Sequence, residues 1–447
     1  MRNQRTAAWL ACALAVALAG CGGASGVKVG TAAYSTKTPK TLTVYLDLPL
    51  NGSARGIQTS IANGARLALD QSGHRVSYGP HGRGGSYHVE FRPRNDADQA
   101  SGNWSQDLTA ASAALASSQP TTVAYIGDFD SAATAISLPA LSPSGILQVS
   151  PWSPYIGFTD ANPADGKGDP ARFYPPSGQT TFARLVPSDL AQAAATVAFM
   201  RSRGVTRLYV LGDVSVFDSA VAQLVANDAP KAGITLVTYQ AGIDTQPNTQ
   251  PAGYLQIATA VAAQRPDAVL LGATPGVGAI ALWRELHTIL PHAKLFAPSM
   301  LATPTFLRAI AAATGVCTTF GGKAVPCRSA AGATYVTSPI LELSQYPARA
   351  KPVLRDYRRR FKIQPTAYAL YGYEAMHDVL LAIQQAGSQA TNRAKLLEIF
   401  FHRLGVLHGV IGDYTIDGNG DSSLQTFDGY RVSPGGALTL MQAIRRG

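Results

Sequence analysis

The feature that most constrains this fold is an alternation of short apolar runs with segments of helical periodicity. Four runs in the first third of the chain have the length and composition of buried strands, at 42–48, 87–91, 123–126 and 146–149. Apolar residues between them recur at helical spacing, around 61–69 and 108–115. Strands that alternate with helices form parallel sheets, because each crossover needs a helix. The sequence therefore predicts an α/β fold with helices on both faces of a parallel sheet.

The same alternation restarts after a stretch rich in Gly, Pro and Asp at 163–178. Four further strands are expected at 208–211, 234–237, 268–271 and 295–296, and helices at 190–200, 221–226 and 277–290. A chain of 447 residues exceeds one small core and suits two lobes of ordinary domain size. An apolar fraction of 46% with only 14% charged residues describes a folded chain rather than a disordered one.

The N-terminus resembles a bacterial lipoprotein signal. Arg2 and Arg5 precede an apolar run at 7–19, and small residues lead up to Cys21; such a run is too short to span a bilayer as a mature helix. The resemblance implies removal of residues 1–20, lipidation of Cys21, and a chain anchored by lipid at the extracytoplasmic face of the cell membrane. An ordinary secretory peptide with a chance cysteine is the alternative. Residues 21–40 predict a flexible linker.

The chain is basic, with a formal net charge of +10. Nucleic acid is one possible partner of a basic protein, but the charges are scattered, and the one dense run contains Arg355, Arg358, Arg359 and Arg360. A solvated helix face explains this run better than a nucleic-acid site. The excess of positive charge also suits an acidic envelope or an anionic ligand.

The cysteines predict a disulfide. Cys12 would leave with the signal and Cys21 would take lipid, so Cys317 and Cys327 remain as a pair. In an oxidising compartment they are expected to form a disulfide that closes a short surface loop. A metal site is the alternative, which the lack of a second nearby pair of thiols disfavours.

Four loops are expected to follow strands at the edge where open parallel sheets bind ligands, at 49–56, 127–131, 150–155 and 212–218. Six strings of the sequence carry a family resemblance. In chain order these are LPLNGSARGIQTSIANGARLALDQ from Leu48, VAYIGDFDSAATAISLPALSPSGILQVSP from Val123, FARLVPSDLAQAAATVAFM from Phe182, RPDAVLLGA from Arg265, YGYEAMHDVLLAI from Tyr371 and GDYTIDGNGD from Gly412. Together they resemble the leucine-binding type (class I) of periplasmic solute-binding lipoproteins of branched-chain amino acid ABC transporters. The resemblance covers nearly the whole chain after the linker.

This resemblance implies a Venus flytrap of two Rossmann-like lobes joined by a three-crossover hinge. Lobe 1 is expected at 41–183 and 341–405, and lobe 2 at 184–340 and 406–447. It implies that the lobes close over a small polar solute, such as an amino acid, an amide or a related carboxylate, and deliver it to an ABC permease. No bond is made or broken in this process, so no enzyme activity is expected. No cofactor, metal or nucleic acid is expected either.

The resemblance assigns ligand contacts residue by residue in lobe 1. Ser131 matches a serine whose hydroxyl binds the ligand carboxylate, at a helix start where free N–H groups favour an anion; the position equally suits an N-cap. Ser153 would supply the hydroxyl of the next loop, because Pro154 stands where the family usually has Thr or Ser. Trp152 would stack on the ligand or pack between the lobes. Tyr373 matches a tyrosine near the cleft, and is otherwise a core or hinge aromatic.

In lobe 2 the pattern departs from the family's amino-acid binders. Phe217 falls where they often place a tyrosine, Thr274 where another aromatic is common, and Ser299 where they carry the carboxylate for the ligand's ammonium. An ammonium buried without a counter-charge is costly, so Asp213 or Asp218 is the expected substitute, if either is more than a turn residue. These departures from the family pattern argue against a branched-chain amino acid as the ligand.

Two other functions stay open from the sequence. A sensor could use the same fold to pass the closed state to a membrane receptor, and an extracytoplasmic enzyme could have recruited it. The chain has neither a Gly-x-Ser-x-Gly elbow nor a His-Glu-x-x-His helix, which disfavours the enzyme. Residues 417–421 alternate oxygen ligands like a calcium loop, but a hairpin turn is favoured because the Gly and Glu of an EF-hand are missing.

Overall fold

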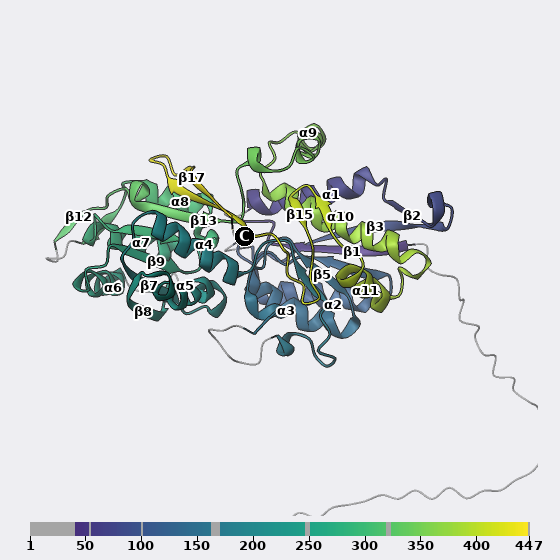
Figure 1. The fold of residues 1–447 in the computed structure, drawn as a ribbon, viewed down its shortest axis with the longest axis horizontal. Helices are drawn as coiled ribbons and strands as arrows, with labels where there is room; N and C mark the ends of the chain where they lie inside the picture. Colours follow the sequence, from purple (N-terminus) through teal and green to yellow (C-terminus); the bar gives the residue numbers. More distant parts are fainter. Residues whose placement is uncertain are drawn as a thin grey trace, which may run out of the picture. The chain divides into compact units, whose positions relative to one another are not determined.

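The computed structural model describes residues 41–52, 55–99, 102–161, 170–245, 251–318 and 323–445. The expected signal peptide at 1–20, the expected lipidation site Cys21 and the expected linker at 21–40 lie outside these residues. Within the described ranges, no helix combines the length and apolar character that a membrane span needs. Two large sheets, each flanked by helices, dominate the fold (Figure 1). We call the six-stranded sheet with its helices lobe 1 and the seven-stranded sheet with its helices lobe 2.

The sheet of lobe 1 has the strand order β2-β3-β1-β4-β5-β6 and is parallel except for the edge strand β2. Its strands are β1 (Thr41–Leu48), β2 (Arg75–Tyr78), β3 (Gly85–Asn95), β4 (Thr122–Ile126), β5 (Leu147–Ser150) and β6 (Phe182–Arg184). The sequence predictions for β1, β3, β4 and β5 are confirmed. Near-continuous burial along β1 and β4 explains why most of their residues are apolar, with Asp47 of β1 as a buried exception.

Helices cover both faces of this sheet, as predicted. One face packs against α1 (Arg55–Gln71), α9 (Ala350–Phe361), α10 (Tyr368–Ala386) and α11 (Arg393–His402), and the other against α2 (Gln106–Ser118) and α3 (Ser131–Leu141). Helices α1 and α10 approach so closely that a Cβ on Gly64 or Gly372 would collide with the backbone of the other helix. Only glycine fits at these two positions, and the close approach holds α10 against the sheet.

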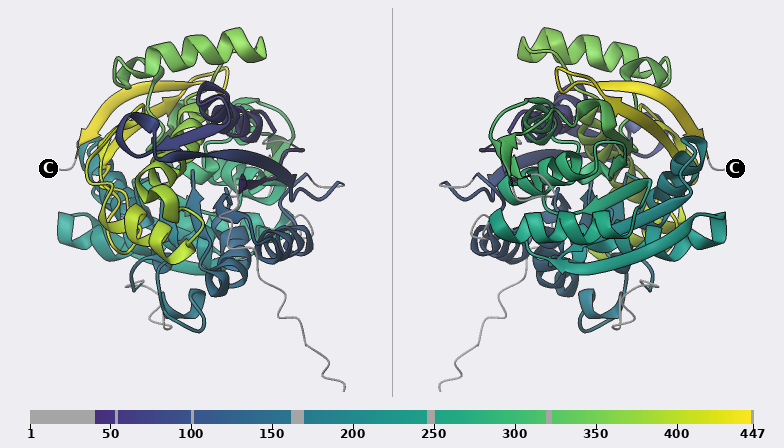
Figure 2. Two further views of the ribbon diagram at one scale, coloured as in Figure 1. Left: turned by 90° about the vertical axis from the view of Figure 1, so that its right-hand side faces the viewer. Right: turned by 90° about the vertical axis from the view of Figure 1, so that its left-hand side faces the viewer.

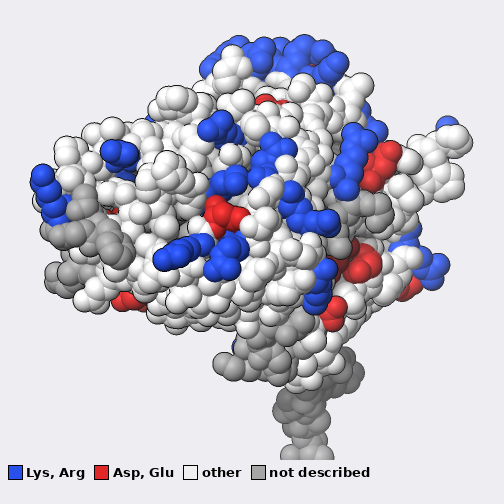
Figure 3. Space-filling model, turned by 60° about the vertical axis from the view of Figure 1, so that its left-hand side comes forward, with Lys and Arg blue, Asp and Glu red and all other residues white. Residues whose placement is uncertain are grey.

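The solvated face predicted for the basic run is confirmed in α9. The helix buries Ala350, Val353 and Tyr357 and leaves its arginines in solvent. Both views of Figure 2 place α9 at the periphery of the molecule. Lysine and arginine side chains gather over this helix at the top of Figure 3.

The sheet of lobe 2 has the order β17-β16-β13-β10-β9-β7-β8, in which β16 and β17 are antiparallel additions at one edge. Its strands are β7 (Arg207–Asp213), β8 (Thr235–Ile243), β9 (Ala268–Gly272), β10 (Lys294–Ala297), β13 (Thr334–Ser338), β16 (Thr426–Val432) and β17 (Leu438–Arg445). One face carries α6 (Pro251–Ala263), α7 (Val277–Ile289) and α8 (Pro304–Ala311), and the other α4 (Asp189–Ser202) and α5 (Val216–Asp228). The predicted second α/β unit is confirmed.

One expected lobe boundary is wrong. The segment from 406 onward was assigned to lobe 2, but the hairpin of β14 (Leu407–Gly409) and β15 (Gly412–Tyr414) packs in the core of lobe 1. The physical reason is that its apolar side chains are buried against α10, where the Tyr414 hydroxyl donates to Asp378 Oδ2 at 2.5 Å. The chain reaches the lobe 2 sheet only at β16.

Two smaller predictions are confirmed. Cys317 and Cys327 form a disulfide with a Cα–Cα distance of 4.9 Å, which joins β11 (Val316–Thr318) to the residue that follows β12 (Ala324–Pro326). Residues 417–421 form the predicted turn, between the antiparallel bridge partners Ile416 and Ser422. In that turn one carboxylate oxygen of Asp417 accepts three backbone N–H groups, those of residues 419, 420 and 421.

Candidate ligand-binding site

The loop between β4 and α3 places Ser131 at the carboxyl edge of the lobe 1 sheet. Asp130, rather than Ser131, occupies the N-cap position of α3, and its side chain makes no capping hydrogen bond. Ser131 is the first helical residue, and its half-buried hydroxyl accepts only a long 3.3 Å contact from the backbone N–H of Tyr155. The first N–H groups of a helix lack partners within it. This end of α3 therefore offers donors and one weakly engaged hydroxyl.

The next loop, after β5, holds Trp152 and Ser153 inside lobe 1. The Ser153 hydroxyl is fully buried, lies 2.5 Å from the Thr134 hydroxyl, and donates to the backbone carbonyl of residue 128 at 3.1 Å. The Trp152 ring stacks on Phe129 at 5.3 Å and lies 5.5 Å from Tyr368. Phe129 is the more exposed of the first two rings. Trp152 and Ser153 thus support the loop that presents Phe129.

In lobe 2, hydrogen-bond donors of the same lobe bind the carboxyl groups of Asp213 and Asp218. Asp213 follows β7 and accepts the N–H groups of Ser215 and Thr274, both at 2.8 Å, and the Thr245 hydroxyl at 3.2 Å. Burial raises the pKa of Asp213 to about 6, while these hydrogen bonds oppose the rise. The Thr274 hydroxyl donates to Asp218 at 2.5 Å. Thr274 therefore links the loop after β9 to the first turn of α5.

Phe217 and Asp218, at the start of α5, face groups of lobe 1. The Phe217 ring makes an edge contact with Tyr155 at 5.0 Å and stacks near Phe158 at 6.3 Å. Burial first, and then the charge of Asp218, raise the pKa of Asp130 to about 7. Each lobe therefore contributes one carboxyl group and one aromatic surface to the same region.

Ser299 and Tyr373 bond to other parts of the scaffold. The Ser299 hydroxyl is buried and donates to Gln192 of α4 at 2.9 Å. The Tyr373 hydroxyl donates to Gln71 at the end of α1 at 2.8 Å. Conversely, the sequence interpretation missed Asp130 and Phe129. The sequence feature that could have identified these two residues is their position in the loop where a strand ends and a helix begins.

Three more carboxyl groups lie beneath the lobe 1 loops. Asp47, Asp96 and Asp128 are fully buried, and their oxygens lie within 4.8 Å of one another. The Tyr125 hydroxyl contacts Asp47 at 2.8 Å and Asp128 at 3.1 Å. A phenol carries one hydrogen, so one of these contacts needs a proton on a carboxyl group. Burial and then neighbouring charge raise the pKa of Asp47 to about 7 and move that of Asp128 well upward.

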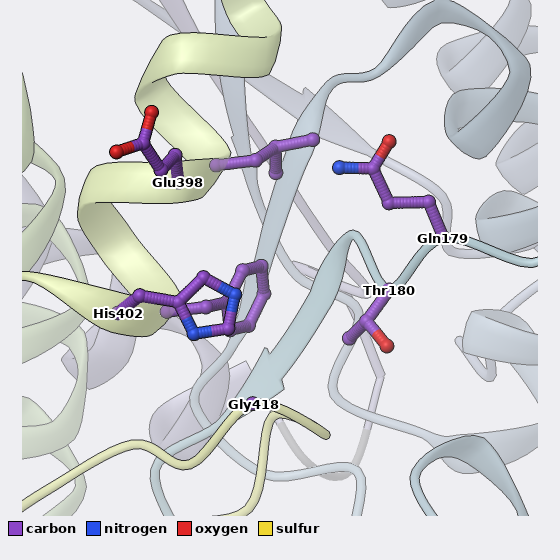
Figure 4. A pocket seen from close by; sticks show the side chains of 7 residues that line it. Gln179, Thr180, Glu398, His402 and Gly418 are labelled. Atoms are coloured by element: carbon purple, nitrogen blue, oxygen red, sulfur yellow. The ribbon is translucent and has the colours of Figure 1, made fainter.

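The described residues contain one further group with metal-ligand chemistry, and a pocket lies elsewhere in lobe 1. Glu374, His377 and Asp378 on α10 bring three ligand atoms within 4.8 Å. The pocket, of about 300 Å³, lies between α11 and the segment before β6 (Figure 4). Its lining is Gln179, Thr180, Leu397, Glu398, Phe401, His402 and Gly418. Gln179 and Thr180 precede β6, so the pocket lies at the amino end of that strand, opposite to the loops above.

Comparisons with known proteins agree with the two-lobed α/β fold. A family model described as periplasmic binding protein matches residues 46–437. A leucine binding protein from Thermotoga maritima MSB8 has a similar structure, with a TM-score of 0.67 at 20% identity, covering 90% of this chain and 99% of that one. A branched-chain amino acid transporter substrate binding protein from Streptococcus pneumoniae, in complex with isoleucine, gives 0.64 at 16% identity, covering 91% and 99%.

A solute binding protein of an ABC transporter from R. palustris, in complex with benzoate, is similar too. Its TM-score is 0.63 at 14% identity, and the match covers 90% of this chain and 96% of that one. At these identities the likeness to solved structures concerns the fold. The comparison with curated proteins gives no match.

Proposed function

We propose, from the premise that the chain belongs to the periplasmic binding protein family, that it is a lipid-anchored protein that captures a small polar solute for an ABC importer. The family consists of extracytoplasmic solute-binding proteins rather than enzymes. The similar structures hold isoleucine in one case and benzoate in another. Family membership therefore leaves the solute class open, and the residues of this chain must decide it.

The observation that carries the proposal is a pair of carboxyl groups supplied by different lobes. Asp130 is the N-cap residue of α3 in lobe 1, Asp218 lies in the first turn of α5 in lobe 2, and the charge of Asp218 helps to raise the pKa of Asp130. A solute ammonium between them would replace this repulsion by attraction. An aromatic acid such as benzoate brings no positive charge. We therefore favour an amino acid or an amide that carries an ammonium group.

The remaining contacts suit the other parts of such a solute. The N-terminus of α3, with the weakly engaged Ser131 hydroxyl, is placed for the solute carboxylate or amide oxygen. Phe129 and Phe217 offer apolar surface from the two lobes, and Thr274 orients Asp218. We assign Trp152 and Ser153 to holding the loop in place, and Ser299 and Tyr373 to the scaffold.

A solute held in this way contacts both lobes only when they meet. Binding therefore shifts the population toward the closed arrangement, by as much as the solute prefers that arrangement. A membrane permease could distinguish closed from open protein by this difference. The sequence before residue 41 supplies the anchor in our proposal, through lipid on Cys21.

The solute class is tested with the purified full chain and a panel of amino acids, amides, short carboxylates, aromatic acids and sugars. A ligand of the folded state raises the thermal midpoint. We expect the largest shift with an ammonium-bearing solute. Calorimetry should then show Asp130→Asn and Asp218→Asn each weakening its binding about tenfold or more, because a charged hydrogen bond is lost.

Asp228→Asn is the matched control, because this residue ends the same helix as Asp218 and pairs with Lys231. It should bind like the wild type. Tightest binding of an aromatic acid or an uncharged sugar, unaffected by either variant of the pair, would contradict the proposed solute class.

The anchor is tested separately by mass spectrometry of protein extracted from membranes. We expect the chain to begin at Cys21 and to carry acyl groups, and Cys21→Ala to release it from the membrane fraction. An unmodified chain that starts at another residue would contradict the lipid anchor, and would leave the solute-binding proposal intact.

A further inference from the structure

A second cluster of titratable side chains lies on α10, away from the proposed solute site. Glu374, His377 and Asp378 follow the spacing i, i+3, i+4, which places them on one face of a single helical turn. Glu374 and Asp378 are 1% and 0% exposed, beneath the β14–β15 hairpin. None of these three residues takes part in the proposed binding of the solute.

The free atoms of these three side chains converge. Glu374 Oε1, His377 Nδ1 and Asp378 Oδ1 are each enclosed without a hydrogen-bond partner among the described residues. The ring nitrogen lies 3.7 Å from either oxygen, which is beyond hydrogen-bond length. Buried polar atoms are normally paired, so three such atoms facing one another indicate a missing partner.

The other atoms of the same side chains are held firmly. Glu374 Oε2 accepts the backbone N–H of Val410 at 2.7 Å, and Asp378 Oδ2 accepts the Tyr414 hydroxyl at 2.5 Å. The His377 ring stacks on Tyr373 with centroids 6.0 Å apart. Outer partners of this kind orient the ligands in metal sites. The free atoms are thereby fixed toward a common point.

We propose that Glu374, His377 and Asp378 bind one divalent transition-metal ion, for which Zn²⁺ is the representative. In a tetrahedral site with bonds of roughly 2.0–2.2 Å, the ligand atoms lie about 3.4 Å apart, close to the 3.7 Å between Nδ1 and each oxygen. One imidazole nitrogen and two carboxylate oxygens suit such an ion better than Ca²⁺. A fourth position is left for water.

Access and charge support the assignment. The His377 side chain is 42% exposed, so the cluster lies just beneath the surface, although its three free atoms are themselves enclosed. Two carboxyl groups and a single imidazole meet in this buried cluster, and a divalent cation would balance their charge. Glycine at residue 409 leaves room for the Glu374 carboxyl group, because a Cβ there would collide with Glu374 Oε1.

The test is titration of the EDTA-treated, purified full chain with ZnCl2 by calorimetry, and with CoCl2 by visible absorption. We expect saturation at one ion per chain, and Co²⁺ bands that report direct coordination. His377→Gln should weaken Zn²⁺ binding at least about tenfold, since removing even an outer partner costs 10- to 100-fold.

His408→Gln is the matched control. His408 lies on the adjacent hairpin and pairs with a single carboxylate, its Nδ1 being 3.0 Å from Asp413 Oδ1. This variant should bind Zn²⁺ like the wild type. The proposal is overturned if Zn²⁺ and Co²⁺ show no saturable binding, or if His377→Gln binds as tightly as His408→Gln. The latter result would mean that His377 forms only an ion pair with the two carboxylates. Circular dichroism of both variants checks that they fold.

Discussion

Both lobes bury aspartates at the carboxyl ends of parallel strands, but they stabilise them with different donors. In lobe 2, two backbone N–H groups and one hydroxyl bind Asp213. In lobe 1, Asp47, Asp96 and Asp128 crowd together and depend on hydroxyl groups. Backbone donors favour the charged form of a carboxyl group, whereas neighbouring carboxylates favour the neutral form. Burial raises the pKa of carboxyl groups in both lobes, to about 6 for Asp213 and about 7 for Asp47, and the donors and neighbours modify this common effect.

The largest effect is expected from Asp213→Asn in lobe 2. An asparagine has one acceptor oxygen, and its NH2 group would face a donor that the carboxylate now satisfies. Each buried donor left without a partner costs about 1–3 kcal/mol, so we expect about 2–4 kcal/mol lower stability at pH 8. Urea unfolding measures it. A midpoint equal to that of the wild type would show that water replaces the lost acceptor, and would remove the contrast between the lobes.

The same substitution in lobe 1 should have the opposite sign. Asp47 has a folded-state pKa of about 7 and Asp96 of about 6, both raised by burial first, against ordinary values of about 3.9. The folded state therefore holds more protons than the unfolded state between about pH 4 and 7, and stability falls as pH rises through that window. Asp128→Asn removes one charge from the crowded group, so we expect about 1–2 kcal/mol higher stability at pH 8.

Urea unfolding at pH 5 and pH 8 checks this prediction. The wild type should lose more stability than Asp128→Asn between the two pH values. If both proteins lose the same amount, the three aspartates do not titrate as a group in this window.

The strands of both sheets can be predicted from the sequence for a simple reason. A parallel strand buried on both faces is a continuous apolar run, as in β4 and β9. The hairpin of β14 and β15 has no such run, and its place in lobe 1 depends on the bond from Tyr414 to Asp378. Local sequence cannot show that pairing, which explains the misplaced boundary at 406.

The candidate sites divide in the same way. Cys317 and Cys327 can be paired because few cysteines remain to choose from. Asp47, Asp96 and Asp128 lie far apart in the chain, and only the neighbouring order of β3, β1 and β4 brings them together. Single acidic residues in such loops are indistinguishable from turn residues in one sequence.

A smaller contrast concerns two hydroxyl groups at the proposed solute site. The Thr274 hydroxyl of lobe 2 is fully engaged with Asp218 at 2.5 Å, whereas Ser131 of lobe 1 has only the 3.3 Å contact with Tyr155. Ser131→Ala should therefore weaken solute binding by about 1–2 kcal/mol with little loss of folding stability. Calorimetry with the solute that the screen identifies measures the first effect, and urea unfolding the second. Unchanged affinity would remove Ser131 from the site.

Thr274→Val serves as the counterpart of that variant in lobe 2. It should lower folding stability, because Asp218 loses its donor. If Thr274→Val affects only solute binding, the Thr274 hydroxyl is a ligand contact, and the two lobes are alike in this respect.

The smallest expected effect tests the contact between the lobes itself. Phe217 of lobe 2 packs against Tyr155 of lobe 1 at 5.0 Å, and an aromatic pair contributes about 0.5–1.5 kcal/mol beyond the area it buries. This contact forms only when the lobes meet, so its loss raises the cost of closure, and with it the dissociation constant of the solute. Phe217→Ala should weaken binding about 2- to 12-fold by calorimetry. Val216→Ala, at an exposed position next to it on α5, should leave the affinity unchanged. A lower urea midpoint for Phe217→Ala at unchanged affinity would mean that the ring stabilises lobe 2 alone. The contact with Tyr155 would then make no contribution to closure of the lobes.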